Sequence, residues 1–360
     1  MQNISSSLRK ILALHRFSAA LARTHSTMDN SPLAVSLQDV QEARERIRER
    51  VHCTPVLECT YLNSLSGRQL FFKCEQFQKT GSFKIRGATN AVMKLVKEAE
   101  DSGKEKPVVV THSSGNHAQA LALAAKLCGI QAQIVMPQTS PTIKVRAVEG
   151  YEGVVTLCVP SEQGRRDAAA AVMKSVGPRA VLIPSSNDPD IMAGQGTIAL
   201  ELFEQVPHLD AIVASVSAGG FVAGIAVGAK GLNPNIKIFV AEPELADDCA
   251  KSIEAGKIIP NPTFPNTVAD ALKMSVCELT FPILQKHASA VITVSEEEII
   301  SAMRLVWERM KVVIEPAAAC SVAAVLSDKF KAKAGPDVKR VGVVLCGGNL
   351  DLDNIPWIKN

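Results

Sequence analysis

The sequence predicts an α/β protein whose strands form open, mostly parallel sheets in two domains. The first observation is a series of short apolar, β-branched runs, the pattern of strands that are buried on both faces. The second is that helical patterns separate most of these runs, as crossover helices do between parallel strands. The third is size, because 360 residues with 47% hydrophobic content suffice for about two domains. The expected strands are residues 69–73, 107–111, 131–136, 153–159, 180–183, 211–216, 236–241, 290–294 and 340–345.

The helices follow from a different apolar spacing. Ser36 can cap a first helix, because a serine oxygen accepts a hydrogen bond from a free backbone N–H. Its inward face would comprise Val40, Ala43, Ile47 and Val51. Ser295 and Glu298 predict a capping box at the start of another helix. The other expected helices are residues 83–98, 117–128, 191–205, 221–231, 296–311 and 317–333.

The charge of the chain lies mainly in its first residues. Because the net charge is +3 and residues 1–28 carry four basic side chains and no acidic one, the rest has a net charge of −1. A nearly neutral body with 4% aromatic residues lacks the basic field and stacking platforms of nucleic-acid binding, so we expect no nucleic-acid partner. The nine cysteines are odd in number and form no C-x-x-C pair, which favours reduced thiols over disulfides or a zinc site.

Residues 1–28 resemble a mitochondrial transit peptide, because they are rich in Ser and Arg and place apolar residues on one helical face. A disordered tail, with translation starting at Met28, is the alternative. Residues 211–229 carry no charge and approach the length of a membrane span. Ser215, Ser217, Gly219 and Gly220 interrupt that stretch, so we interpret it as a buried strand, loop and helix, with no membrane partner.

Three loops lie where ligands gather in parallel sheets, between a strand end and a helix start. They are residues 111–117, 217–220 and 346–349. Small residues in the second loop let backbone N–H groups surround a phosphate. Each loop taken alone is equally consistent with an ordinary turn.

Lys84 lies between Phe83 and Ile85 near a helix start, where a cation is unfavourable. Its stem could simply reach water. Alternatively it is a partly desolvated amine with a lowered pKa that can react with a carbonyl group.

Four motifs together carry a resemblance, in order and spacing, over about residues 36–353. They are Ser82-Phe83-Lys84-Ile85-Arg86-Gly87, Ser113-Ser114-Gly115-Asn116-His117, Ala193-Gly194-Gln195-Gly196-Thr197 and Gly347-Gly348-Asn349. The chain resembles the pyridoxal-phosphate enzymes of the tryptophan-synthase-β-like fold, and within them the branch of serine racemases and serine/threonine dehydratases.

The resemblance implies roles for individual residues. Lys84 would hold pyridoxal 5'-phosphate and act as the base on one face of the substrate, with Ser114 on the other face. Ser114 favours racemisation, which needs a proton on both faces. Residues implied to bind the cofactor are Phe83, Lys84, Asn116, Ser186, Ser217, Ala218, Gly219, Gly220 and Cys346. Residues implied to bind the substrate are Ser113, Ser114, Asn116, His117 and Arg165.

Two effector sites are also implied by the resemblance. Glu242, Ala246 and Asp248 match a site for Mg²⁺, Mn²⁺ or Ca²⁺, although an acidic loop in solvent is the simpler interpretation of the sequence alone. ATP would bind as an allosteric effector at the interface of a homodimer. The residues implied there are Thr60, Lys79, Thr80, Gln119, Tyr151 and Asn349.

Departures from the family pattern leave alternatives open. Ser217 and Ala218 replace two glycines, and a positive φ at either position would strain the loop. Cys346, where the racemases have serine, also occurs in some dehydratases. Met274 replaces a small polar residue near the substrate and cannot donate a hydrogen bond, and Ala271 replaces a glycine.

The expected function is interconversion of L- and D-serine with side elimination to pyruvate and ammonia. A dehydratase without racemase activity, an aspartate racemase and a catalytically silent relative are the alternatives. The expected domains are a large cofactor domain of residues 33–100 and 187–353 and a small mobile one of residues 101–186. A cytoplasmic location is expected unless residues 1–28 direct import into mitochondria.

Overall fold

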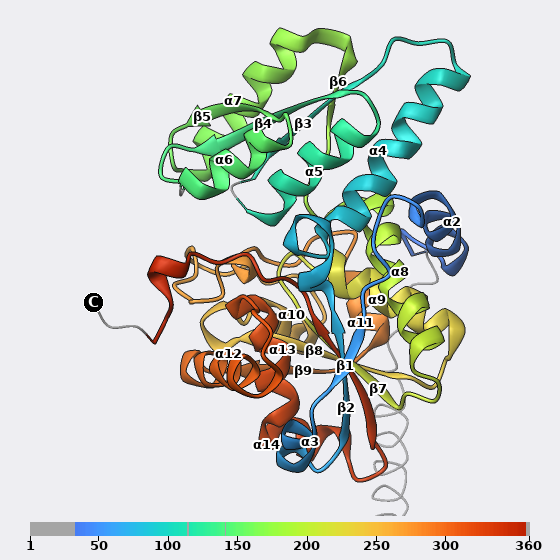
Figure 1. The fold of residues 1–360 in the computed structure, drawn as a ribbon, viewed down its shortest axis with the longest axis vertical. Coiled ribbons are helices and arrows are strands. Elements are labelled where there is room, and N and C mark those ends of the chain that lie inside the picture. Colours follow the sequence, from blue (N-terminus) through green and yellow to red (C-terminus); the bar gives the residue numbers. More distant parts are fainter. Residues whose placement is uncertain (1–32, 114, 141, 358–360) are drawn as a thin grey trace, which may run out of the picture. The chain divides into compact units, whose positions relative to one another are not determined.

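The computed structural model describes residues 33–113, 115–140 and 142–357, and the fold begins at Ala34. The expected leader, residues 1–28, lies outside this range. The described strands form two sheets (Figure 1). They are β1 (Val56–Glu58), β2 (Gln69–Cys74), β3 (Val108–His112), β4 (Gln131–Pro137), β5 (Val154–Cys158), β6 (Ala180–Leu182), β7 (Ala211–Ser215), β8 (Lys237–Pro243), β9 (Ala288–Val294) and β10 (Arg340–Leu345).

The two sheets confirm the predicted α/β class. The six-stranded sheet has the order β1-β2-β10-β7-β8-β9, and all its neighbours are parallel except β1 and β2. The four-stranded sheet has the order β5-β4-β3-β6 and is wholly parallel. All nine predicted strands are present, with ends that differ by a few residues, and only β1 was not predicted. Strand β10 pairs with both β2 and β7, so it joins the two ends of the chain in one sheet.

The helices cover these sheets and mostly match the prediction. Ser36 and Ser295 both form capping boxes, with Asp39 and Glu298 as partners. The described helices are α2 (Leu37–Ile47), α3 (Thr60–Ser66), α4 (Lys84–Asp101), α5 (Asn116–Leu127), α6 (Thr142–Gly150), α7 (Glu162–Val176), α8 (Pro189–Gln205), α9 (Gly220–Leu232), α10 (Asp248–Ala255), α11 (Phe281–His287), α12 (Glu296–Met310), α13 (Pro316–Leu326) and α14 (Asp328–Ala334).

One predicted helix was wrong, and five helices were not predicted. The expected helix 317–333 is two helices, because Ser327 has an extended backbone and its side chain caps α14 by accepting from Phe330 N. The helices α3, α6, α7, α10 and α11 were missed. In α7, Ala169 is the one buried residue, so this helix has no apolar stripe that a periodicity could reveal.

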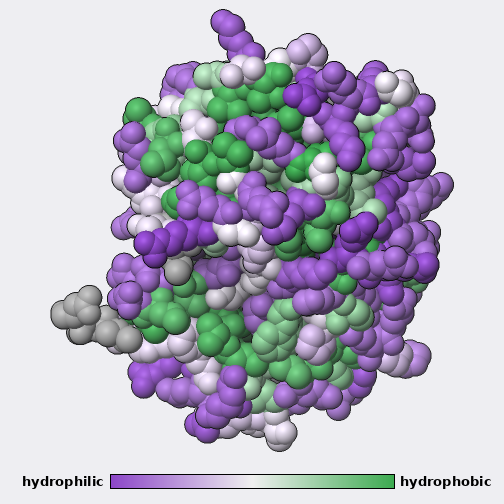
Figure 2. Space-filling view, turned by 45° about the horizontal axis from the view of Figure 1, so that its top comes forward, coloured by the Kyte–Doolittle hydropathy of each residue, from purple (hydrophilic) through white to green (hydrophobic). Residues whose placement is uncertain are grey.

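The uncharged stretch 211–229 is part of the protein core, as predicted. It forms β7, a loop and most of α9, and both elements are almost wholly buried. Among the described residues, no helix combines the length and the hydropathy that a membrane span requires. All nine cysteines lie among the described residues, and each has a free thiol. On the face drawn in Figure 2, hydrophobic side chains form separate patches between hydrophilic ones.

The topology brings several loops to the carboxyl ends of parallel strands. Lys84 follows β2, Asn116 follows β3, Gly219 follows β7 and Cys346 follows β10. Since β2, β10 and β7 are neighbours in one sheet, three of these loops start at the same edge.

Candidate active site

Lys84 is the first residue of α4 and is half-buried. Its Nζ donates a hydrogen bond to the Ser185 carbonyl oxygen at 2.6 Å. Burial lowers the pKa of Lys84 to about 8, although the charge of Glu315 acts in the opposite direction. About a tenth of this amine is therefore unprotonated at pH 7, and the unprotonated form is the one that a nucleophilic or basic lysine uses.

Phe83 precedes this lysine and ties it to two other loops. The Phe83 ring stacks on Phe221 with centroids 4.0 Å apart, and Phe83 N donates to the Cys346 carbonyl oxygen at 3.1 Å. Phe221 lies in the first turn of α9, directly after the glycines of the expected phosphate loop. The lysine loop, the phosphate loop and the loop after β10 are thus in direct contact.

The phosphate loop is held by hydroxyl groups from other segments. Gly220 N donates to Ser186 Oγ at 2.7 Å, and Thr280 Oγ1 donates to the Ala218 carbonyl oxygen at 2.8 Å. Gly219 has a φ of 93°, and a Cβ there would lie 2.6 Å from Thr280 Oγ1, so this position requires glycine. Thr280 was not predicted, since its segment is distant in sequence.

The replacements Ser217 and Ala218 do not strain this loop. Neither residue has a positive φ, so a Cβ costs nothing in backbone conformation. The Ser217 hydroxyl accepts from Met274 N at 3.2 Å and donates to the Met274 carbonyl oxygen at 3.3 Å. Two departures from the family pattern are therefore in contact with one another.

Asn116 begins α5 and contacts a residue that the sequence alone did not reveal. Its Nδ2 donates to both carboxylate oxygens of Glu315, at 3.0 and 3.1 Å, and its Oδ1 accepts from Asn349 Nδ2 at 2.9 Å. Glu315 is 2% exposed, and burial, aided by the charge of Asp270, raises the pKa of its carboxyl group to about 7. The available signal was an acidic residue between an apolar run and a proline at a helix start.

Cys346 lies beside Glu315, with Sγ 3.9 Å from Oε1. Burial, with the charge of Glu315, raises the pKa of this thiol well above its usual range. The thiol is therefore neutral at physiological pH.

Three of the expected substrate residues lie at the start of α5: Ser113 precedes it, and Asn116 and His117 are its first two residues. Ser113 N donates to the Val135 carbonyl oxygen at 3.1 Å. His117 is buried with Nε2 3.1 Å from the Ile183 carbonyl oxygen, and burial, with the charge of Lys84, lowers its pKa to about 3, so the ring is neutral. Arg165 lies on α7. Burial lowers the pKa of His112, and the positive charge of Arg165 lowers it further. Ser114 lies outside the described residues.

These residues form a site that fits pyridoxal phosphate. A lysine amine with a lowered pKa lies next to a loop whose glycines could not carry side chains, at the amino terminus of α9. One further hydroxyl, Ser82 Oγ, is buried next to Phe83 without a hydrogen-bond partner among the described residues. A bound ligand would supply the partner that this buried group lacks.

The expected cation residues lie apart from this site. Glu242 ends β8 and accepts from Cys249 N and Ala250 N, both at 2.9 Å. Asp248 begins α10, and burial raises its pKa to about 6. Burial, with the charge of Asp248, raises the pKa of Glu242 well above its usual range. Two neighbouring carboxylates suit a divalent cation, and Ala246 precedes Asp248 by two residues, although the described residues contain no metal-binding group of three or more acidic, His or Cys side chains.

The expected nucleotide residues are only partly brought together. Asn349 Nδ2 donates to the Thr80 carbonyl oxygen at 2.7 Å, and Thr80 has a φ of 63°, an outlier for a β-branched residue. Tyr151 lines a separate cavity of about 350 Å³ next to α5, the helix that carries the buried Gln119. The recorded hydrogen bonds of the described chain do not link Thr60 or Lys79 to Asn349.

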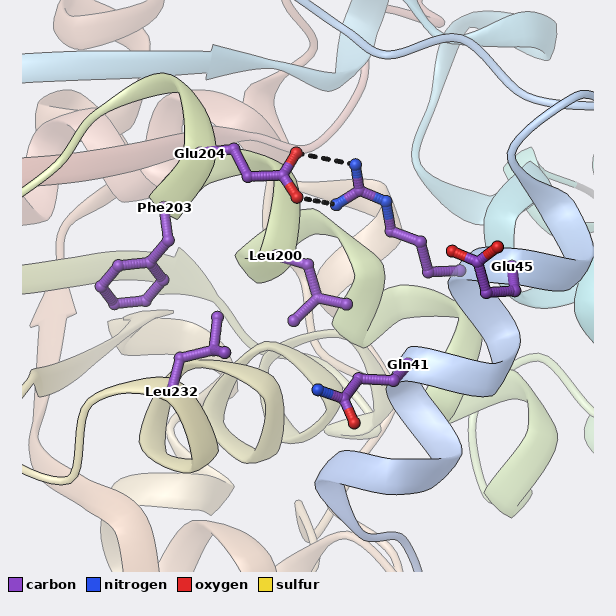
Figure 3. Close-up of a pocket in the computed structure, with 7 residues that line it drawn as sticks. Gln41, Glu45, Leu200, Phe203, Glu204 and Leu232 are labelled. Atoms are coloured by element: carbon purple, nitrogen blue, oxygen red, sulfur yellow. Dashed lines mark hydrogen bonds and ion pairs between the residues drawn. The ribbon is translucent and has the colours of Figure 1, made fainter.

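The larger cavity, of about 610 Å³, lies away from all these residues, between α2, α8 and the end of α9 (Figure 3). Leu200, Phe203 and Leu232 line it, and Arg44 forms a two-pronged ion pair with Glu204 at its edge. No predicted site residue lines it, so it does not belong to the candidate active site.

Comparison with known proteins agrees with this geometry. Residues 47–347 match the family model described as pyridoxal-phosphate dependent enzyme. A serine racemase of Homo sapiens is 49% identical over 326 residues, which cover 90% of this chain and 94% of that protein. The crystal structure of serine racemase from Dictyostelium discoideum has a TM-score of 0.82 and 44% identity, and covers 89% of this chain and 100% of that one. A pyridoxal 5'-phosphate-dependent aspartate racemase has a TM-score of 0.85 and 41% identity, and covers 91% of this chain and 99% of that one. The chain therefore belongs to the family of pyridoxal-phosphate-dependent enzymes.

Proposed function

We propose that this enzyme is a serine racemase that also eliminates water from serine to give pyruvate and ammonia. The observation that carries the proposal is the Lys84 amine, whose lowered pKa and position among the strand-end loops suit a base that acts at the Cα of an amino acid. The high identity to serine racemases along nearly the whole chain supports the choice of substrate.

In this proposal some residues bind the cofactor and the substrate, and Lys84 and Ser114 transfer the proton. Gly219 and Gly220 bind the phosphate group, while Asn116 and the neutral Cys346 thiol hold the ring. The bound cofactor supplies an electron-withdrawing ring that makes the Cα proton of the substrate acidic. Lys84 Nζ removes that proton on one face, and the Ser114 hydroxyl returns a proton on the opposite face. Backbone N–H groups from Ser113 to His117 bind the substrate carboxylate, and Arg165 contacts the substrate. Loss of the β-hydroxyl after proton removal gives the elimination product.

A chiral assay of the products tests this function directly. The full chain is incubated with L-serine and pyridoxal phosphate, and D-serine and pyruvate are both measured. Appearance of D-serine is the expected result, and Ser114→Ala should suppress it while elimination from L-serine persists. Pyruvate without D-serine would reject the racemase and leave the dehydratase.

Binding of the cofactor has its own readout. The visible absorption band of lysine-bound pyridoxal phosphate should appear in the wild-type chain and be absent from Lys84→Ala. A wild-type chain without the band would support the catalytically silent alternative.

Aspartate is the second candidate substrate, because the aspartate racemase structure matches nearly all of the chain. Met274, which is 47% exposed beside the phosphate loop, offers no hydrogen bond to a second carboxylate. We therefore expect serine to be turned over faster than aspartate, and a preference for aspartate in parallel assays would reverse the assignment.

The effector sites and the dimer belong to the same proposal. Mg²⁺, or Mn²⁺ or Ca²⁺, binds at Glu242, Ala246 and Asp248, and ATP binds near Thr60, Lys79, Thr80, Gln119, Tyr151 and Asn349 at a homodimer interface. Tyr61 and Leu65, on one face of α3, are 42% and 45% exposed, which supports an interface next to Thr60. Sedimentation with and without ATP tests both the dimer and its dependence on the nucleotide.

We further propose that residues 101–186 form a small domain that closes over the substrate. Strands β3 to β6 all lie in this range, and the Lys144–Asp270 ion pair of 3.0 Å connects it to the rest of the described fold. Hydrogen exchange with and without serine tests the closure.

We propose a cytoplasmic location unless residues 1–28 act as a transit peptide. A reporter protein fused to these residues distinguishes the two locations.

A further inference from the structure

The helix that carries Lys84 begins without a side-chain cap of its own. Phe83 occupies the cap position with helical backbone angles and makes no side-chain hydrogen bond there. The first N–H groups of a helix have no partner within it, and Ser, Thr, Asp or Asn usually satisfies one of them. Several other helices of this chain follow that rule. Their capping residues are Ser36, Ser161, Asp188, Ser295 and Ser327.

The missing cap of α4 comes from α8. Gln195 Oε1 accepts a hydrogen bond from Gly87 N, in the first turn of α4, at 3.1 Å, and Gln195 is 1% exposed. The two helices lie side by side in Figure 1. Glycine at both positions allows the helices to approach closely: a Cβ on Gly194 would lie only 2.5 Å from the Gly87 Cα. The glutamine therefore reaches a backbone group that is 108 residues away in sequence.

The next turn of α8 holds the side chain of the residue before Gly87. Arg86 Nη1 donates to Thr197 Oγ1 at 3.2 Å and to Glu201 Oε1 at 2.7 Å. Arg86 is fully buried, so these contacts leave it little freedom. Gly194, Thr197 and Glu201 are spaced as one face of a helix, and all of them contact the first turn of α4.

The tip of Lys84 depends on the same region of the chain. Its amine donates to the Ser185 carbonyl oxygen, four residues before the start of α8. Residues 185–201 therefore hold both ends of the lysine. Gln195 and the partners of Arg86 hold the backbone of its helix, and the Ser185 carbonyl oxygen holds its amine.

We propose that the Ala193–Thr197 segment positions Lys84, with Gln195 acting as the cap that α4 lacks. The segment carries one of the four sequence motifs, yet none of its residues has a role in the proposed function. The inference rests on the proposed role of Lys84 as the amine that holds the cofactor. Gln195 acts through the helix and is a positioning residue, because it makes no recorded contact with the amine.

The test measures the Lys84 amine in the full-length chain after the cofactor has been removed. Acetylation of Lys84 by acetic anhydride is quantified by peptide mass spectrometry as a function of pH. In parallel, pyridoxal phosphate is added and the rate at which the visible band recovers is recorded. Urea unfolding of each variant separates a change in the amine from a general loss of stability.

Gln195→Met removes the acceptor at similar size, and Gln195→Glu keeps an oxygen at the same place. We expect Gln195→Met to change the acetylation rate of Lys84 at pH 7 and the band recovery by at least about threefold, and Gln195→Glu to remain nearer to wild type. Gln195→Asn, one methylene too short to reach Gly87, serves the same purpose if the methionine variant does not fold.

Asn90→Ala is the matched control. Asn90 is buried in α4, and its Nδ2 donates to the Asp190 carbonyl oxygen of α8 at 2.7 Å, so the same two helices lose one hydrogen bond beyond the first turn. The variant also loses the hydrogen bond that Asn90 Oδ1 accepts from Arg46 of α2. This variant should lose stability and leave Lys84 acetylation unchanged. Wild-type behaviour of Gln195→Met and Gln195→Asn, or an equal change in Asn90→Ala, would overturn the inference. A band that survives Lys84→Ala would instead refute the proposed function.

Discussion

Two buried clusters of charged side chains differ in how their charges are balanced. In the first, the cations Lys73 and Arg86 face the anions Glu75 and Glu201, with ion pairs of 2.6 to 2.7 Å. In the second, Glu242 and Asp248 lie close together, and the recorded salt bridges of the described chain include neither of them. All six residues are less than 6% exposed.

The charged form of the buried side chain is favoured in the first cluster and disfavoured in the second. Burial alone would lower the pKa of Arg86, but Glu75 and Glu201 outweigh it and the pKa is raised. At Glu242, burial and the charge of Asp248 act together and raise the pKa. The balanced cluster is therefore complete as it stands and stabilises the fold. The acidic pair has hydrogen-bond donors but no cationic partner among the described residues, so we expect it to take up a cation.

Removing one member of the balanced cluster should have the largest effect. In Arg86→Met, Glu75 and Glu201 stay buried without their main cation, so we expect a loss of about 3–5 kcal/mol in the free energy of unfolding. Urea unfolding measures this loss. Arg304→Met, which breaks the exposed Arg304–Glu308 pair, is the control and should leave the free energy of unfolding nearly unchanged. Equal losses in the two variants would mean that the buried network is not specially stabilising.

Glu315 extends the comparison to a single carboxylate that accepts hydrogen bonds and forms no salt bridge with the described residues. Since burial and Asp270 raise its pKa from 4.5 to about 7, the folded chain binds more protons than the unfolded chain in that range. Its contribution to stability is present below about pH 4.5 and is lost as the pH rises towards 7, by at most about 3 kcal/mol. In unfolding experiments from pH 4.5 to 7.5, Glu315→Gln should remove this part of the pH dependence. An unchanged pH profile would contradict the raised pKa.

The acidic pair should respond to a cation. At a Mg²⁺ concentration 100 times the dissociation constant, a cation that binds only the folded chain would add about 2.7 kcal/mol. We expect Asp248→Asn to abolish most of this gain in thermal unfolding. Asp247→Asn is the matched control, because Asp247 already pairs with Lys251 at 2.6 Å and should leave the gain intact. A wild-type chain without any gain would show that the pair does not bind Mg²⁺.

The smallest effect is expected for the uncharged contact between Ser217 and Met274. Ser217→Gly restores the family glycine and removes the two hydrogen bonds to Met274, which should cost about 1 kcal/mol or less. The pyridoxal phosphate affinity should change little, because Gly219 and Gly220 remain. A large loss of affinity would instead show that the Ser217 hydroxyl binds the phosphate.

Most of the fold could be predicted, because strands and helices leave local patterns. The nine predicted strands are mainly apolar and rich in β-branched residues, and the capping boxes at Ser36 and Ser295 need only residues three apart. Helix α7 could not be found in this way, since it buries only Ala169. The break at Ser327 was missed, because the apolar pattern continues across it.

The candidate site divides in the same manner. Lys84, Asn116 and the 217–220 loop were predicted from motifs and strand ends. Glu315, Thr280 and the role of Gln195 were not, because each acts through a partner that is 62 to 199 residues away. No periodicity or local motif records a contact over such distances.

By itself, the sequence determined the alternation of strands and helices, the lysine motif and the small residues of the phosphate loop, since these depend on neighbouring residues and backbone preference. Only the tertiary structure decided the charge states. The lowered pKa of Lys84 and the raised pKa of Glu315 arise from desolvation by segments that are remote in the chain. It also decided that α8 caps the helix of Lys84, because that contact requires two glycines to bring the helices together.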